Sequence, residues 1–228
     1  MTAELLRQRA IKAGASLVGF CALGERAPQA FPALKYAVSI AYRLSDTVLS
    51  TITDCPTPMY FHHYRTVNFR LDQIALDLTA LLEGEGYAAM PVAASQSLPG
   101  APYRGLFPHK TAAVLSGLGF IGRSGLFLSR EYGSKVRLAT VLTDFPLEND
   151  RPVILDGCGD CTACRDACPA GAISGSDCRY DGSRGDFFDA EKCSRYMKDH
   201  FQQIGRGSVC GICIRVCPRN RLKPVGRD

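Results

Sequence analysis

The strongest constraint on this chain is the segment CGDCTACRDACP, residues 158–169, whose cysteines and proline follow the spacing C-x2-C-x2-C-x3-C-P. With this spacing, short successive turns point three thiolates at one 4Fe–4S cluster, and the proline turns the fourth toward a second cluster. Zinc sites usually use two separated C-x2-C pairs instead. The segment therefore predicts a small module that holds two iron–sulfur clusters.

A second run, CGICIRVCP at residues 210–218, has Gly207 where a symmetric copy of the first run would have a cysteine. One ligand must then come from elsewhere, and Cys193 in DAEKCSRY is the best candidate. Cys178 lies in a Gly/Ser/Asp-rich stretch and is predicted to be a loop thiol, with exchange for Cys193 as the alternative. The predicted ligands are Cys158, Cys161, Cys164 and Cys217 for one cluster, and Cys168, Cys193, Cys210 and Cys213 for the other.

The distribution of cysteines predicts two domains. Of the 11 cysteines, Cys21 and Cys55 stand alone, and the others lie beyond residue 157. Clustered cysteines in a chain without an apolar signal segment indicate metal binding rather than disulfides. We expect a cytoplasmic protein with no membrane span, in which residues 1–150 form a cofactor domain and residues 151–228 form the cluster domain.

The formal net charge of +5 is weak evidence for a nucleic-acid partner. Eight cluster thiolates and two oxidised four-iron cores would reduce it to about +1.

Residues 1–150 carry mixed α and β patterns. Helices are predicted over 3–13, 64–82 and 109–119, the second from its helical spacing of apolar residues. Strands are predicted over 18–23, 36–43, 87–93, 125–129 and 135–143. Between them, residues 95–108 form a long irregular loop of the kind that is often functional.

The segment SGLGFIGRSG, residues 116–125, contains the pattern G-x-G-x-x-G of dinucleotide-binding loops, and Asp144 follows at about the right distance. That fingerprint requires a strand before the glycines and a long helix after them. Here the predicted helix precedes the glycines and the β-rich GLFLS follows, so we reject a dinucleotide site.

The run from His109 to Asp144, followed by CGDCTACRDACPAGAI, DAEKC and CGICIRVCP, resembles the epoxyqueuosine reductases and the reductive dehalogenases. The resemblance covers about residues 60–220. It implies an α+β protein, with a nitroreductase-like α/β domain followed by a ferredoxin-like double-cluster module. It also implies a base-off cobalamin that the two clusters reduce, and the ligand crossing of the family agrees with the assignment above.

Two departures from the family pattern limit what the resemblance implies. Epoxyqueuosine reductases continue into helical repeats that help to hold tRNA, whereas this sequence ends at Asp228. They also have an aspartate proton donor ahead of the glycine block, and none lies between Gln96 and Lys110 here. The matching position is about Tyr103. The resemblance therefore gives only weak grounds for tRNA as a partner.

Several residues are candidates for the site that the resemblance implies. Tyr103 is the candidate proton donor, because Arg104 follows it and a nearby cation favours the phenolate. The glycines of the block lack a Cβ and let the backbone approach a bulky cofactor. The candidate cobalamin contacts are His62, Tyr64, Arg104, His109, Lys110, Gly117, Gly119, Gly122, Arg123 and Ser124.

The predicted function is that of an oxidoreductase that takes electrons from a low-potential donor, a ferredoxin or flavodoxin, and passes them through two clusters to cobalamin. One alternative is an electron-transfer protein that reduces the corrinoid of a partner protein. A second alternative is a flavin-dependent nitroreductase fused to a ferredoxin. The substrate cannot be read from the sequence.

Overall fold

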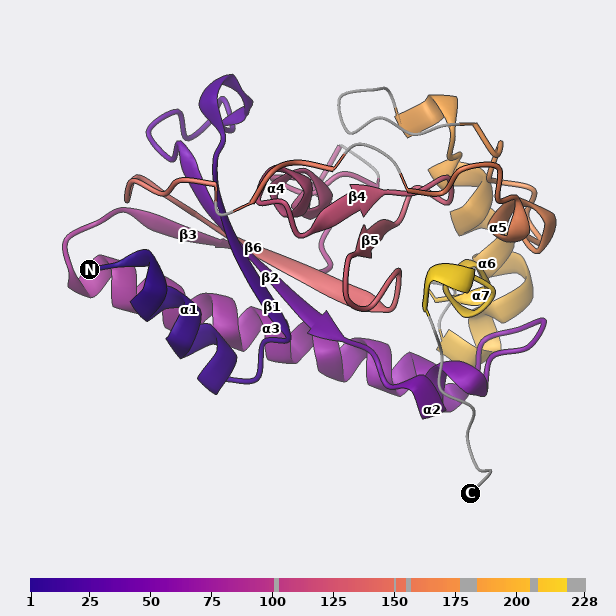
Figure 1. Cartoon of the computed structure of the whole chain (residues 1–228). Coiled ribbons are helices and arrows are strands. Elements are labelled where there is room, and N and C mark those ends of the chain that lie inside the picture. Colours follow the sequence, from indigo (N-terminus) through magenta and orange to yellow (C-terminus); the bar gives the residue numbers. More distant parts are fainter. Residues whose placement is uncertain (101–102, 150, 155–156, 177–183, 206–208, 221–228) are drawn as a thin grey trace. The chain divides into compact units, whose positions relative to one another are not determined.

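The structure is a computed structural model of residues 1–228, and it describes all of them except 101–102, 150, 155–156, 177–183, 206–208 and 221–228 (Figure 1). The chain forms two compact units, each assembled from separate segments. The first unit contains residues 1–43, 67–119 and 137–154. The second contains residues 44–66, 120–136 and 155–228.

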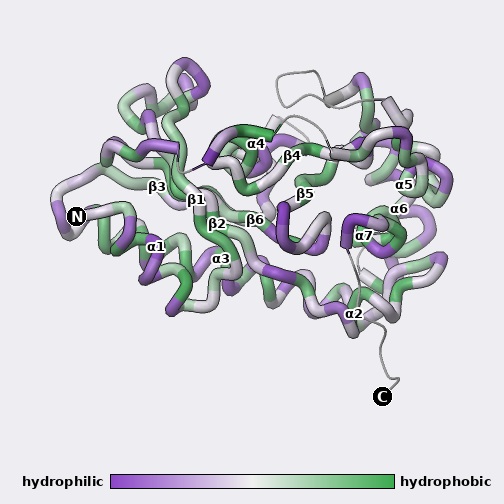
Figure 2. The backbone as a smooth tube through the Cα atoms, in the orientation of Figure 1, coloured by the Kyte–Doolittle hydropathy of each residue, from purple (hydrophilic) through white to green (hydrophobic). Residues whose placement is uncertain are grey.

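The first unit is built on a mixed α+β core with a four-stranded sheet in the order β1-β2-β6-β3. Its strands are β1 (Leu17–Ala22), β2 (Tyr36–Arg43), β3 (Ala89–Val92) and β6 (Val136–Thr143). β1 and β2 are antiparallel, as are β3 and β6. Hydrophobic stretches run along β1 and β2 (Figure 2). Pro91 is tolerated because β3 lies at an edge of the sheet.

Helices cover both faces of this sheet. α1 (Ala3–Lys12) and the part of α3 (Pro58–Gly84) that belongs to the first unit lie on one side, and α4 (His109–Leu115) lies on the other (Figure 1). Gly19 of β1 allows α4 to pack closely, since a Cβ there would lie 2.8 Å from that of Ser116. The predicted helix 109–119 is shorter in the structure because Gly117 turns out of it with φ +67°.

α3 begins before the predicted helix 64–82. Pro58 lies ahead of the predicted helix but inside α3, whose start is capped: the Thr57 hydroxyl accepts a hydrogen bond from the Tyr60 amide at 3.2 Å. Proline suits the first helical position, where its missing N–H is not needed. The proline therefore starts the helix rather than interrupting it.

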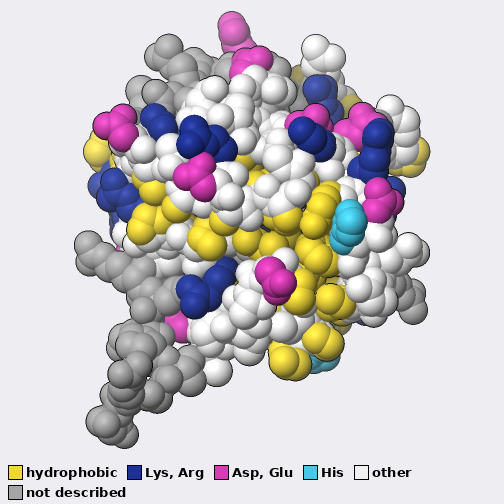
Figure 3. All heavy atoms as spheres, turned by 90° about the vertical axis from the view of Figure 1, so that its right-hand side faces the viewer, with side chains coloured by type: hydrophobic (Ala, Val, Ile, Leu, Met, Phe, Trp, Pro, Cys, Tyr) yellow, Lys and Arg dark blue, Asp and Glu magenta, His cyan; other side chains and the backbone are white. Residues whose placement is uncertain are grey.

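The second unit consists of short elements. Its helices are α2 (Asp46–Ser50), the start of α3, α5 (Ala163–Asp166), α6 (Ala190–Gly205) and α7 (Ile212–Arg215), with 3-10 turns at Arg184–Asp186 and Pro218–Asn220. Its two paired strands are β4 (Gly119–Ile121), which belongs to this unit from Phe120 onward, and β5 (Phe127–Ser129). On the side that carries α5 and α6, apolar side chains form a band bordered by charged ones (Figure 3). Among the described residues, no helix is both long and apolar enough to span a membrane.

A buried ion pair links α2 to the end of the β-rich segment in the second unit. Lys135 Nζ lies 2.6 Å from Asp46 Oδ1, with the two side chains 5% and 12% exposed. We expect Asp46→Ala to destabilise the protein by about 3–5 kcal/mol, because it leaves a buried ammonium unpaired. Glu191→Ala, which breaks the exposed pair between Arg195 and Glu191, should cost under about 1 kcal/mol. Thermal unfolding checks both values, and equal losses would contradict the prediction.

Candidate functional site

The cysteines of the two runs lie in and around two short helices, whereas Cys193 lies in α6. The first run leads into α5, and its last member, Cys168, follows that helix; the second run leads into α7 in the same way. Gly159 and Gly211 adopt left-handed conformations with φ +53° and +84°, which glycine reaches without a Cβ penalty. A Cβ on Gly211 would lie 2.6 Å from the Tyr60 ring. The glycines therefore shape the turns that aim the thiols.

One set of thiols joins the first run to the end of the second. Burial raises the pKa of Cys164, and negative charge on Cys158 and Cys217 raises it further. Burial likewise raises the pKa of Cys217, with contributions from Cys158 and Cys161. The same four cysteines line one small hollow.

The other set joins the second run to two distant cysteines. Burial raises the pKa of Cys213, and the charges of Cys210, Cys193, Cys168 and Cys164 add to that shift in decreasing order. Cys164 of the first set therefore contributes as well, and the assignment of each ligand to one cluster stays a prediction.

The chemistry of these thiols suits iron–sulfur clusters. All cysteines that the structure describes are free thiols, and Cys178 lies outside the described residues. Burial opposes the ionisation of Cys164, Cys210, Cys213 and Cys217, whereas metal coordination deprotonates a thiol. Among the described residues, no three His, Cys, Asp or Glu side chains are arranged to hold a metal ion. Free thiols are the ligand type that four-iron clusters require.

Three of the predicted corrin contacts lie beside the first set of thiols. A Cβ on Gly122 would lie 2.7 Å from Leu128 Cδ1 and 3.1 Å from Cys158 Sγ. Arg123 and Ser124, which follow it, line the hollow of the four cysteines. This part of the glycine block therefore packs against the cluster cysteines within the second unit.

The other glycines of the block belong to the first unit. Gly117 has φ +67°, and a Cβ there would lie 2.7 Å from the backbone oxygen of Arg151. A residue with a side chain at position 117 would therefore clash with Arg151 of the same unit. Gly119 is the first residue of β4. Their predicted role in cofactor binding stays a prediction.

Tyr103 and Arg104 lie in the long loop of the first unit. Tyr103 is the one described residue other than glycine with positive φ, at 63°, and its side chain is 38% exposed. The Leu98 amide donates a hydrogen bond to the Arg104 carbonyl at 2.8 Å and closes the loop. A non-glycine residue in this conformation is uncommon and often marks a functional position.

His62 and Tyr64 lie in the second unit, in the first turns of α3. The Tyr64 ring is 6.5 Å from that of Tyr60. His63, which lies between His62 and Tyr64 in the sequence, accepts a hydrogen bond at Nε2 from the Ser45 amide, 3.0 Å away. Burial lowers the pKa of His63, and the neighbouring His62 lowers it further. His63 is thus a structural partner of the α2 start, whereas the roles of His62 and Tyr64 stay predictions.

His109 is buried at the start of α4, with Lys110 beside it. Its Nε2 lies 2.9 Å from the Ala93 carbonyl, which can only accept, so Nε2 carries the proton. Nδ1 lies 2.8 Å from the Thr140 hydroxyl and accepts from it. Both ring nitrogens of the neutral imidazole are therefore engaged within the first unit. A role in cofactor binding, predicted for both residues, would require one of these His109 bonds to break.

Because of His109, we expect the free energy of unfolding to decrease as the pH falls. Burial lowers the pKa of His109 from 6.5 to about 4. The unfolded chain then binds one more proton between these values, so stability present above pH 6.5 is lost as pH falls toward 4. We expect a loss of about 2 kcal/mol at pH 5. Thermal unfolding between pH 7.5 and 5 measures it, and His109→Gln should show a shallower dependence. Identical slopes in the two proteins would contradict this assignment.

Sequence reasoning missed a buried polar contact behind Cys217. Asn220 Oδ1 accepts from the Ser134 amide at 2.8 Å and from the Ser134 hydroxyl at 2.9 Å. Because the Ser134 hydroxyl has one proton, it donates either to Asn220 or to Cys217; a bond to Cys217 lowers the pKa of that thiol, as does the Arg219 amide. Ser134 belongs to the turn at residues 132–134, here called the Y-G-S turn, within the run from His109 to Asp144. Nothing in the sequence indicates that Asn220 is its partner. A further thiol, Cys55, lies near Cys210 and contributes to its raised pKa.

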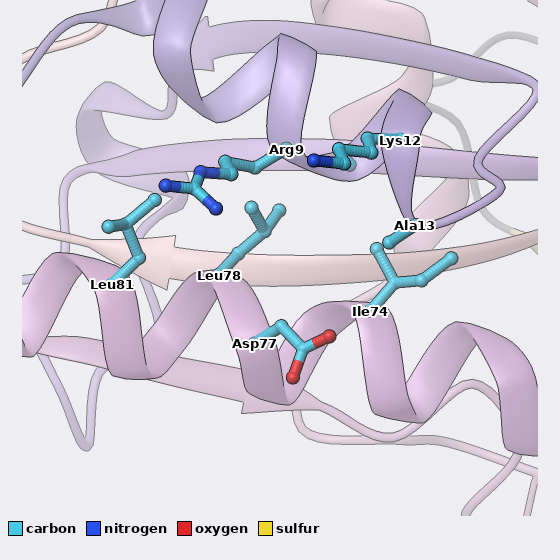
Figure 4. Close-up of a pocket in the computed structure, with 8 residues that line it drawn as sticks. Arg9, Lys12, Ala13, Ile74, Asp77, Leu78 and Leu81 are labelled. Atoms are coloured by element: carbon cyan, nitrogen blue, oxygen red, sulfur yellow. The ribbon is translucent and has the colours of Figure 1, made fainter.

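Another cavity lies away from the cysteines. It measures about 380 Å³ between α1 and α3 in the first unit, with Arg9, Lys12 and Asp77 around a floor that includes Leu78 (Figure 4). None of the predicted site residues lines it. We assign no function to this cavity.

Comparison with protein families identifies the cysteine module. Residues 157–220 match the family described as "4Fe-4S double cluster binding domain". The match contains all eight predicted cluster ligands.

Sequence relatives extend the similarity beyond the cysteines. The chain is 37% identical over 126 residues to epoxyqueuosine reductase of Staphylococcus aureus, which is 51% of this chain and 30% of that protein. It is 32% identical over 133 residues to tetrachloroethene reductive dehalogenase of Desulfitobacterium hafniense, covering 51% of this chain and 23% of that protein. The chain is a relative of the epoxyqueuosine reductases and the reductive dehalogenases. It matches about a third or less of the length of these two proteins.

Solved structures of the same two groups share the fold. A catabolic reductive dehalogenase has a TM-score of 0.76 at 24% identity, over 96% of this chain and 32% of that one. An epoxyqueuosine reductase has a TM-score of 0.62 at 24% identity, over 98% of this chain and 66% of that one. At this identity the likeness concerns the fold alone.

Proposed function

We propose that this relative of the epoxyqueuosine reductases is an iron–sulfur reductase that passes electrons through two 4Fe–4S clusters to a base-off cobalamin. The observation that carries the proposal is the match of residues 157–220 to the 4Fe-4S double cluster binding family, which contains all eight predicted ligands. The cobalamin acts on a substrate that remains to be identified. A low-potential ferredoxin or flavodoxin supplies the electrons.

The finer fold assignment belongs to this proposal. Residues 1–150 form a nitroreductase-like cofactor domain, and residues 151–228 form a ferredoxin-like module. The shared fold of the reductive dehalogenase and epoxyqueuosine reductase structures supports this assignment. The two compact units do not follow this boundary, since each combines segments from both sides of residue 150.

Cysteines of the chain supply the cluster ligands, and hydrogen bonds from its backbone affect the reduction potential of the clusters. Cys158, Cys161, Cys164 and Cys217 hold one cluster, and Cys168, Cys193, Cys210 and Cys213 hold the other. Bound clusters carry single electrons. Hydrogen bonds to the sulfurs favour the reduced cluster, and the Ala172 amide supplies one to Cys168 Sγ at 3.4 Å.

Tyr103 is the proton donor in this proposal. Its strained backbone holds a partly exposed phenol in the long loop of the first unit, where a proton can be replaced from solvent. Arg104 follows it in the same loop.

Anaerobic reconstitution followed by titration with cobalamin tests the proposal. We expect about eight iron atoms per chain and one bound corrinoid with a base-off absorption spectrum. A chain that holds both clusters but binds no corrinoid would overturn the cobalamin assignment.

A second candidate function is an electron-transfer protein that reduces the corrinoid of a partner protein. Two observations favour it: Gly122 and Arg123 face cluster cysteines, and the His109 nitrogens are already bonded. Those groups are then unavailable to a corrin. It predicts cluster reduction and complex formation with a corrinoid protein, without corrinoid binding by the chain alone. A flavin spectrum in the purified protein would instead indicate a flavin nitroreductase.

A further inference from the structure

Arg123 lies where the sequence pattern suggested a corrin contact, but its surroundings in the second unit are the thiols of one cluster site. We infer that Arg123, together with Arg219, sets the reduction potential of the cluster held by Cys158, Cys161, Cys164 and Cys217. This inference rests on the cluster assignment of the proposed function and on no assumption about cobalamin.

The backbone of this segment touches the cluster site directly. The position of a Gly122 Cβ would be 3.1 Å from Cys158 Sγ, so the chain passes against the sulfur immediately before Arg123. Arg123 then lines the hollow of the four cysteines. A side chain at position 122 would push this segment of the chain away from the thiols. The close approach of the backbone to Cys158 therefore explains why glycine precedes Arg123.

Among the residues that the structure describes, two cations and no carboxylate line the hollow. Besides the cysteines, its lining consists of Arg123, Ser124, Leu128, Pro218 and Arg219. Arg219 follows the ligand Cys217 by two positions and lines the same hollow. Both arginines thus border the same cluster site from different segments of the chain.

The charge balance explains the expected effect. Four thiolates around an oxidised four-iron core give a net charge of about −2, and reduction makes it about −3. A cation nearby stabilises the more negative state more strongly, and low polarity increases the effect. Arginine keeps its charge at every accessible pH. Removing it should therefore make reduction of this cluster harder without introducing a pH dependence.

The test uses the reconstituted full-length protein and an anaerobic redox titration followed by electron paramagnetic resonance. We expect Arg123→Gln to lower one of the two cluster midpoints while the other stays unchanged. A tenfold change in the reduction equilibrium would correspond to about 59 mV for one electron. Arg123→Lys should retain most of the native potential because it keeps the charge. Arg130→Gln is the matched control, since this exposed arginine of the same segment does not line the hollow.

The outcomes separate this inference from the function it rests on. Unchanged midpoints in an Arg123→Gln protein with full iron content would overturn the role of Arg123, and so would an equal shift in Arg130→Gln. Should Arg123→Gln lose iron, Arg219→Gln carries the same test, with the same shift expected and an unchanged midpoint overturning the inference. A wild-type chain that holds fewer than two clusters would refute the cluster assignment itself.

Discussion

Replacing Cys164 and Cys217 together with alanine will leave one iron–sulfur cluster on the chain, whereas replacing Cys213 and Cys217 together will leave none. The reason is the crossing of ligands. Cys164 and Cys217 are far apart in sequence but belong to one set of thiols. Cys213 and Cys217 are close in sequence but belong to different sets. Each double variant removes the same number of thiols, so the two variants differ only in how the losses are distributed.

Iron and acid-labile sulfide per chain measure this result after anaerobic reconstitution. About four iron atoms should remain in the first double variant and close to none in the second. Cys178→Ala serves as the control and should keep both clusters, because Cys193 is the proposed eighth ligand. If each run of cysteines bound its own cluster, the second double variant would keep one cluster, and that result would contradict the crossing.

Gly133→Ala will destabilise the protein far more than Gly24→Ala, although both glycines have nearly the same backbone conformation. Their φ values are +59° and +57°. A Cβ on Gly24 meets nothing within 4 Å, whereas one on Gly133 would lie 2.6 Å from the Arg219 carbonyl oxygen and 2.6 Å from Asn220 Oδ1. We expect Gly24→Ala to cost about 1–2 kcal/mol from φ alone. Gly133→Ala should cost about 2–5 kcal/mol, because the packing clash adds to that strain.

We expect Gly133→Ala to affect the cluster site as well. Gly133 precedes Ser134, whose bonds to Asn220 hold the turn that follows Cys217. Thermal unfolding under anaerobic conditions gives the stability difference, and iron analysis shows whether the cluster of Cys217 is lost with it. Similar stability in the two variants would mean that the Y-G-S turn does not hold this contact.

Much of the first unit could be predicted from local patterns. The strands at 36–43 and 135–143 agree with the structure to within one residue, since β-rich runs bounded by turn residues leave few alternatives. The start of α3 could not be predicted, because Pro58 looks the same in a loop as at a capped helix start. In the second unit, α6 was also not predicted.

By itself, the sequence determined the kind of metal site and the eight candidate ligands, because the spacing of cysteines along a short chain segment limits which thiolates can converge. Only the tertiary structure decided what lies against that site. The glycine block suggested a cofactor-facing loop, but the neighbours of Gly122 and Arg123 are cysteines from a distant segment. Likewise, Ser134 finds its partner Asn220 86 residues away. Contacts between segments so far apart depend on packing of the whole unit, and no local pattern specifies them.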